Sequence, residues 1–332
     1  MNYELFVGID ISKRSIDVAV LKPQSIHQAE HRVFGNDCPG LEDMLEWVLS
    51  AGITLDRILF CCEHTGLYVI PLSSFLSLKE ANLWIENALQ IKRSVGLQRG
   101  KSDKADALAI ARYAFTHQHE ARLYELPSPI ISKLKHLLAF REQLVRQQTS
   151  LKCTFSELKG FDRQNAEYCL RESCELLAIF QDKIQKIDAE LMKTMEQDEE
   201  LKRKFNLVQT VHGIGKQTAF FILIHTQGFT SFSDYRKFAC YSGIAPFPYS
   251  SGTSIRGRNR VSHLANKKLK SLLTMCALNT IKKDNEFKRY YERKKAEGKS
   301  FLCIMNAIKN KLLSRVFAVI RKETAYIPNL AT

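Results

Sequence analysis

The chain of 332 residues is 45% hydrophobic, which is enough for two or three folded domains, and its formal net charge is +14. Its apolar runs fall far short of the roughly 18 residues that a membrane span requires, and its first residues show no signal segment, so we expect a cytoplasmic protein without a membrane partner. Nine scattered cysteines without a CxxC pair argue against a zinc ribbon and against a disulfide framework.

Residues 1–126 are predicted to form a mixed α/β domain. Apolar runs predict an antiparallel meander of three strands, at Leu5–Ile9, Ile16–Leu21 and Arg32–Gly35. A helix, a strand, a helix and a strand follow, at Leu41–Leu49, Ile58–Glu63, Leu67–Leu78 and Asn82–Glu86. This order describes a mixed sheet of the RNase H type.

Residues 127–203 show a purely helical pattern. Apolar residues recur at spacings of three and four in two stripes: Ile131, Leu134, Leu138 and Val145, then Leu177, Phe180, Ile184, Ile187 and Leu191. Two long antiparallel helices with a break near residues 160–162 fit this pattern. Either an ordinary helical hairpin or a coiled-coil arm for dimerisation explains the stripes.

Residues 204–332 are predicted to form a mostly helical domain with one irregular stretch, Tyr249–Asn259. Its last helices are expected at Asn266–Ile281 and Ser300–Ile320, and Lys267 and Lys268 open the first of them. From Ser251 to Lys322 there are 19 Lys and Arg against four Asp and Glu, whereas the rest of the chain has 30 basic and 31 acidic residues. This one-sided excess predicts a polyanionic partner, with nucleic acid ahead of an anionic membrane.

Four carboxylates fall where a predicted strand ends or a predicted helix begins. Asp10 follows the first strand and Glu63 ends the fourth, whereas Asp103 and Asp106 lie one turn apart after Ser102, a candidate N-cap. Each alone suits a solvated strand end or a helix N-terminus. Together, as oxygen ligands without Cys or His, they predict a site for Mg²⁺ or Mn²⁺.

Two further motifs suit phosphate chemistry. Gly213, Gly215 and Lys216 lie in a Gly-Ile-Gly-Lys turn before a helix, which could grip a nucleic-acid backbone or could be a plain packing corner. In the stretch Tyr249–Arg260, hydroxyls lie beside glycines and beside three arginines at alternate positions: Arg256, Arg258 and Arg260. Such a segment can place a nucleophile next to a phosphate, or can bind phosphate without chemistry.

Taken together, these blocks resemble one known family. The segments Val7–Lys13, Cys62–Gly66 and Lys101–Ala107 look like the DEDD tetrad of RuvC-like insertion-sequence transposases related to Piv invertase. The His-Gly-Ile-Gly turn, Phe238–Pro246 and Ser251–Gly257 are similar to that family's C-terminal transposase domain. The family is the one numbered one hundred and ten in insertion-sequence nomenclature, and it includes the bridge-RNA-guided recombinases.

The resemblance implies more than the spacing does. It gives Asp10, Glu63, Asp103 and Asp106 the role of Mg²⁺ ligands and makes Ser251 the residue that attacks the scissile phosphate. It further implies donor and target DNA, a structured non-coding guide RNA, and a homodimer or homotetramer. Small departures are His212, where a proline is common, and His64, where a small residue is usual.

Three other functions are compatible with parts of the sequence. An actin-like or sugar-kinase ATPase also opens on a β-hairpin that holds an Asp, but it normally requires glycine after that Asp, where this chain has Ile11 and Ser12, and the sequence shows no second Gly-rich phosphate loop. A metal-dependent junction endonuclease would use the tetrad with water as the nucleophile. A catalytically silent nucleic-acid-binding protein would bind DNA and cut nothing.

Overall fold

The computed structural model describes residues 3–25, 29–94, 96, 102–251 and 255–328, which form two compact units, 1–126 and 127–332. The predicted division of the second unit at residue 203 falls inside helix α7 (Glu199–Thr210), and it stays a prediction. None of the described helices combines the length and the apolarity that are needed to cross a membrane.

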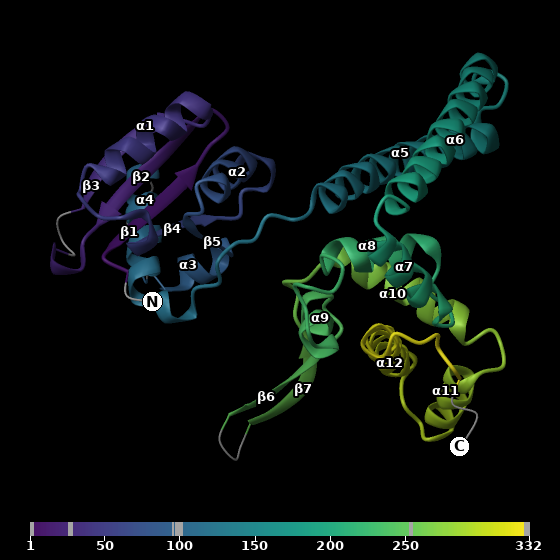
Figure 1. Cartoon of the computed structure of the whole chain (residues 1–332). Coiled ribbons are helices and arrows are strands. Elements are labelled where there is room, and N and C mark those ends of the chain that lie inside the picture. Colours follow the sequence, from purple (N-terminus) through teal and green to yellow (C-terminus); the bar gives the residue numbers. More distant parts are fainter. Residues whose placement is uncertain (1–2, 26–28, 95, 97–101, 252–254, 329–332) are drawn as a thin grey trace. The chain divides into compact units, whose positions relative to one another are not determined.

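The first unit is built on a five-stranded mixed sheet with the order β3-β2-β1-β4-β5 (Figure 1). Its strands are β1 (Leu5–Ile11), β2 (Ser15–Leu21), β3 (Glu30–Gly35), β4 (Ile58–Glu63) and β5 (Asn82–Glu86). The first three form an antiparallel meander, and β4 and β5 run parallel to β1. The predicted RNase H-type order of strands and helices is confirmed.

Helices cover both faces of this sheet, because both faces of its central strands are apolar. α1 (Cys38–Leu49) and α2 (Ile70–Leu78) pack on the face that carries Leu5, Val7 and Ile9. α3 (Ala88–Ser94) and α4 (Asp103–Thr116) pack on the opposite face, over Phe6 and Leu59. The two faces therefore belong to two separate cores, and the candidate carboxylates lie on the α4 side.

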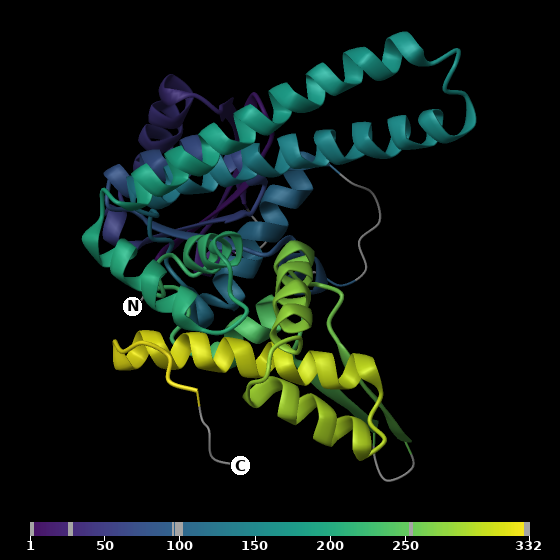
Figure 2. The same ribbon diagram turned by 90° about the vertical axis from the view of Figure 1, so that its right-hand side faces the viewer.

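The second unit begins with a long antiparallel hairpin of α5 (Pro129–Phe161) and α6 (Glu167–Met195), seen from the side in Figure 2. Three residues of each predicted stripe are buried between the helices: Ile131, Leu134 and Leu138, and Ile184, Ile187 and Leu191. The polar interruptions are satisfied, since Arg141 forms a two-pronged ion pair with Asp188 at 2.6 and 3.1 Å. The helical hairpin is confirmed.

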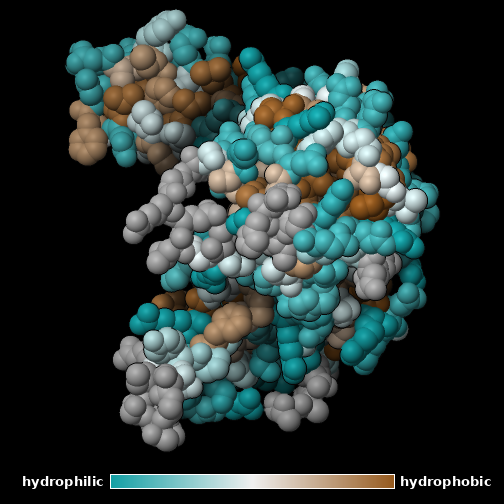
Figure 3. Space-filling view, turned by 90° about the vertical axis from the view of Figure 1, so that its left-hand side faces the viewer, coloured by the Kyte–Doolittle hydropathy of each residue, from teal (hydrophilic) through white to brown (hydrophobic). Residues whose placement is uncertain are grey.

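The end of this hairpin exposes apolar side chains. Figure 3 shows them gathered on a protruding lobe, and the exposed residues of this part are Phe161, Tyr168, Leu176 and Ile179. Phe161 is 93% exposed. No described residue of the second unit covers this surface.

The remainder of the second unit is mostly helical and shares one core with the base of the hairpin. Its helices are α7, α8 (Lys216–His225), α9 (Tyr235–Tyr241), α10 (Lys267–Thr280), α11 (Glu286–Ala296) and α12 (Phe301–Lys322). α8 is central, because every residue from Thr218 to Ile224 is buried.

The stretch Tyr249–Asn259 is predicted to be irregular, but its described residues belong to a two-stranded hairpin of β6 (Pro246–Ser251) and β7 (Ile255–Val261). The glycines and serines of the stretch suggested a loop. Arginines at every second position are in fact typical of a strand, where alternate residues share a face.

Candidate active site

The site is organised by the close approach of α4 to β1. A Cβ atom at Gly8 would lie 2.2 Å from both the Ala107 carbonyl oxygen and the Ala111 amide nitrogen. Only glycine therefore lets the helix backbone rest directly on the strand. Since Asp10 lies two residues beyond Gly8, this contact brings the start of α4 to the end of β1.

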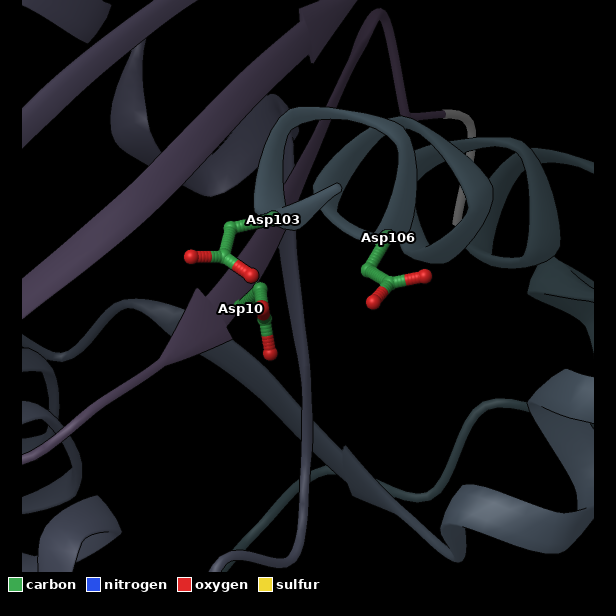
Figure 4. Close-up of side chains that lie close together, drawn as sticks. All are labelled: Asp10, Asp103 and Asp106. Atoms are coloured by element: carbon green, nitrogen blue, oxygen red, sulfur yellow. The ribbon is translucent and has the colours of Figure 1, made fainter. Parts of the chain in front are cut away.

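Three of the four predicted carboxylates meet at this point. Oxygen atoms of Asp10, Asp103 and Asp106 all lie within 4.8 Å of one another. Figure 4 shows Asp10 at the end of β1, with Asp103 and Asp106 beside it on the first turn of α4. Ser102 caps that turn as predicted, because its hydroxyl accepts a hydrogen bond from the Ala105 amide at 3.2 Å.

Glu63 lies at the same end of the neighbouring strand. The parallel register pairs Ile9 with Cys62, so Asp10 and Glu63 stand side by side on the α4 face of the sheet. Glu63 does not join the group of three within 4.8 Å, although its charge acts on Asp10.

Two more carboxylates at this end of the sheet escaped the sequence analysis. Asp17 pairs with Asp10 across β1 and β2, and Glu86 pairs with Glu63 across β4 and β5. An Asp17 carboxylate oxygen lies within hydrogen-bond distance of the His31 Nε2 atom, at 2.8 Å, and Glu86 accepts a hydrogen bond from the Tyr113 hydroxyl at 3.3 Å. The alternation of residues along β2 and β5, and the position of Glu86 at the end of a predicted strand, are signals that point to this face, but the sequence does not give the register that brings the two residues to the site.

The crowding of like charges shifts the pKa of the central residue, Asp10. Burial first, and then the charges of four neighbouring carboxylates, together raise the pKa of Asp10 to about 6; in order of effect the carboxylates are Asp106, Asp103, Glu63 and Asp17. Within the described ranges, no Lys or Arg forms an ion pair with the three clustered aspartates. Clustered carboxylate oxygens that repel one another, with no described cationic side chain paired with them, form a suitable binding site for a hard divalent cation.

Gly8→Ala is expected to lower the free energy of unfolding by about 1–3 kcal/mol, because the added methyl overlaps backbone atoms of α4 that cannot move independently. Urea unfolding measures this loss. Gly160→Ala is the matched control, since Gly160 lies in α5 and, apart from its own helix backbone, no atom lies within 4 Å of its Cβ position. Equal stability of the two variants would contradict the packing argument.

The two glycines of the Gly-Ile-Gly turn have different surroundings: Gly213 is closely packed, whereas Gly215 has open space beside it. Gly213 has a φ of +86° and lies so close to Thr280 of α10 that a Cβ there would meet its hydroxyl at 1.9 Å. Gly215 is the N-cap residue of α8, with open space at its Cβ position, and Lys216 beside it is exposed. Packing thus accounts for Gly213, and the predicted nucleic-acid contact of all three residues stays a prediction.

The strands β6 and β7 carry the candidate nucleophile and the alternating arginines. The backbone of Ser251 ends β6 and pairs with Ile255, whereas the side chains of Ser251, Arg256 and Arg258 lie outside the described residues. Arg260 is exposed.

The two lysines that open α10 differ. Lys267 is exposed, but Lys268 forms an ion pair with Glu142 of α5 at 2.6 Å. Lys268 therefore also ties α10 to the hairpin.

Two family models match the chain. The first, the DEDD transposase model of the IS110 group, matches residues 7–158, and the second, described as "Transposase IS116/IS110/IS902 family", matches residues 205–292. The chain belongs to the IS110 family of transposases.

Individual relatives agree with this family. The transposase is 26% identical over 329 residues to the "Pilin gene-inverting protein" of Moraxella bovis and, equally, to that of Moraxella lacunata, with 97% of each chain covered. It is 31% identical over 120 residues to the "Insertion element IS110 uncharacterized 43.6 kDa protein" of Streptomyces coelicolor, covering 36% of this chain and 29% of that protein. Among solved structures, T. thermophilus RuvC in complex with a Holliday junction substrate is similar at 12% identity and a TM-score of 0.29, covering 37% of this chain and all of that one.

The two matched regions contain the predicted chemistry of the transposase. Residues 7–158 include the four carboxylates, and residues 205–292 include the Gly-Ile-Gly turn and the hairpin that carries Ser251.

Proposed function

We propose that this DNA transposase is an RNA-guided recombinase, which cleaves and rejoins DNA through a covalent link between Ser251 and a DNA phosphate. The observation that carries the proposal is the cluster of Asp10, Asp103 and Asp106 at the end of β1, in a chain of a transposase family. A carboxylate cluster of this kind suits the handling of phosphodiesters with a divalent cation.

Asp10, Asp103 and Asp106, with Glu63 on the adjacent strand, are the residues that would hold the cation, either Mg²⁺ or Mn²⁺. When bound there, it supplies Lewis-acid polarisation of a phosphoryl oxygen. The raised pKa of Asp10, at about 6, still leaves its carboxylate ionised at neutral pH.

The covalent step is assigned to Ser251. Its Oγ forms a bond to phosphorus, the bond from phosphorus to the 3′-oxygen breaks, and the released 3′-hydroxyl takes up the proton that the serine gives up. Arg256, Arg258 and Arg260 follow within nine residues, and guanidinium groups stabilise the charge on a phosphate that is under attack. Rejoining reverses the same step with a different 3′-hydroxyl.

The proposed partners are donor and target DNA and a structured guide RNA. The excess of basic residues between Ser251 and Lys322 supports a nucleic-acid partner. The relatives named for inverting a pilin gene support the rearrangement of DNA segments. Guidance by base pairing would leave the protein to recognise shape and backbone.

A homodimer or homotetramer completes the proposal. The exposed apolar end of the α5–α6 hairpin, with Phe161 and Tyr168, supports self-association (Figure 3).

The purified transposase is expected to carry a specific RNA transcribed beside its own gene, because its basic C-terminal segment needs a polyanion and the family resemblance supplies a guide. Sequencing the co-purified RNA measures this. RNase treatment should abolish strand exchange, and adding back the RNA should restore it. A random mixture of transcripts, or full strand exchange after RNase, would refute the guide.

A further inference from the structure

A basic hollow lies between α11 and α12, apart from every residue singled out in the sequence. It has a volume of about 380 Å³. Glu286, Arg289, Tyr290 and Arg293 succeed one another at spacings of three, one and three, so α11 presents all four on one face. Lys311 and Arg315 lie one turn apart on α12 and complete the wall. Four cationic side chains thus face a single carboxylate.

That carboxylate is already engaged. Arg315 donates two hydrogen bonds to Glu286, at 3.2 and 3.3 Å, and the Tyr326 hydroxyl donates a third at 2.5 Å. These hydrogen bonds outweigh burial and lower the pKa of Glu286. Glu286 therefore pairs with Arg315, and although the Lys311 charge also acts on it, neither Lys311 nor Arg293 forms an ion pair with it in the described residues.

Aromatic contacts hold two of the remaining cations in place. The Lys311 ammonium lies 4.7 Å from the centroid of the Tyr290 ring, and the Arg293 guanidinium lies 5.7 Å from it. In the part of the chain that the structure describes, neither has a carboxylate within ion-pair distance, whereas Arg289 has Asp284 at 3.7 Å. A cation over a ring gains about 0.5–1 kcal/mol at an exposed site, which orders the side chain without cancelling its charge.

We propose that this hollow, the α11–α12 pocket, binds a phosphate of a nucleic-acid backbone. Lys311 and Arg293 are its principal ligands, with Arg289 at the rim and the Glu286–Arg315 pair as its fixed wall. A guanidinium offers paired donors to phosphate oxygens, and a lysine adds a point charge. A nucleic acid is the source because the pocket lies inside the segment that holds the whole basic excess of the chain. The inference rests on the proposed function and adds a second anchoring point to it.

The test compares two double variants of the full chain that lose the same charge. The double variant Lys311→Gln with Arg293→Gln removes the two cationic side chains of the pocket that form no ion pair with a described carboxylate. Lys282→Gln with Lys283→Gln is the control, because these exposed lysines lie in the turn before α11 and do not line the pocket. Fluorescence anisotropy across a salt series is measured with three labelled 20-nucleotide probes of one mixed sequence: single-stranded RNA, single-stranded DNA and duplex DNA. Urea unfolding of each variant checks the fold.

The pocket variant is expected to bind at least one probe about tenfold more weakly than the control variant, with a salt slope reduced by about one for each lost phosphate contact. A loss confined to RNA assigns the pocket to the guide, and a loss confined to DNA assigns it to the substrate. Equal affinities and slopes for the two double variants on all three probes would overturn the proposal. This binding assay does not depend on recombination. If the parent protein failed to exchange strands, that result would contradict the proposed recombinase function but would leave the test of the pocket unaffected.

Discussion

Asp10→Asn is expected to lower strand exchange by at least about 10³-fold, to the background, while making the metal-free protein more stable. The substitution removes a charge from the centre of the cluster formed with Asp103 and Asp106, and with it a cation ligand. The same removal relieves the repulsion that raises the pKa of Asp10 to about 6. Activity and metal-free stability should therefore change in opposite directions, as is typical of a binding site rather than of a structural carboxylate.

The sign of the pH dependence follows from linkage. The pKa of Asp10 is about 6 in the folded protein, against an ordinary value of 3.8 for an exposed aspartate, so the folded state binds this proton more tightly than the unfolded state does. The parent protein thus loses stability as the pH rises from about 4 to about 6, and the loss stays constant above that. A shift of this size corresponds to at most about 3 kcal/mol, and solvent screening of the half-buried group reduces it to about 1–2 kcal/mol.

Urea unfolding in EDTA at pH 4 and at pH 7 measures this difference. Asp10→Asn should match the parent at pH 4 and exceed it at pH 7. Asp43→Asn, on an exposed position of α1, is the control and should show no such pH-dependent gain. Adding Mn²⁺ at pH 7 should then stabilise the parent but not the Asp10 variant. Undiminished strand exchange by the parent in EDTA would refute the metal site.

The first unit could be predicted closely because its signals are local. Short apolar runs mark buried strands, and Ser102 marks the start of α4, so Asp10 and Asp103 could be expected at element ends. Glu86 also ends a predicted strand, but the position of Asp17 and Glu86 beside the other carboxylates could not be expected, because it depends on the register of β2 on β1 and of β5 on β4. A register is a property of paired strands and has no signature within one of them.

In the second unit, the sequence predicts helices less well where charged residues outnumber the apolar residues that mark a buried helix face. Helix α11 has almost no apolar stripe to mark it in the sequence, because its only buried residue is Phe287. The pocket that it forms with α12 depends on helix packing, and no spacing in the sequence reveals it. Likewise, the conformation of Gly213 follows from the approach of Thr280, 67 residues away.

Ser251→Ala is expected to abolish the covalent protein–DNA adduct and to lower strand exchange by at least about 10³-fold, the scale on which loss of an essential catalytic group acts. No hydroxyl remains at this position to form a bond to phosphorus. RNA and DNA binding should be unchanged, because the Arg260 guanidinium and the lysines of α10 and α11 are untouched. Denaturing gel electrophoresis of a labelled DNA substrate detects the adduct, and anisotropy measures the binding.

Ser250→Ala is the matched control, because Ser250 is the adjacent hydroxyl in the same strand, β6, and pairs with Arg256 in the hairpin. It should still form the adduct, since a change in the hairpin backbone alone would affect both variants equally. Peptide mapping of the parent adduct decides which residue carries the DNA. An adduct on Ser254 would preserve the mechanism and reject Ser251, whereas DNA cleavage without any adduct would reject the serine mechanism. In the latter case the carboxylate cluster would act as a nuclease that uses water as its nucleophile, and Ser251→Ala would cut DNA as fast as the parent does.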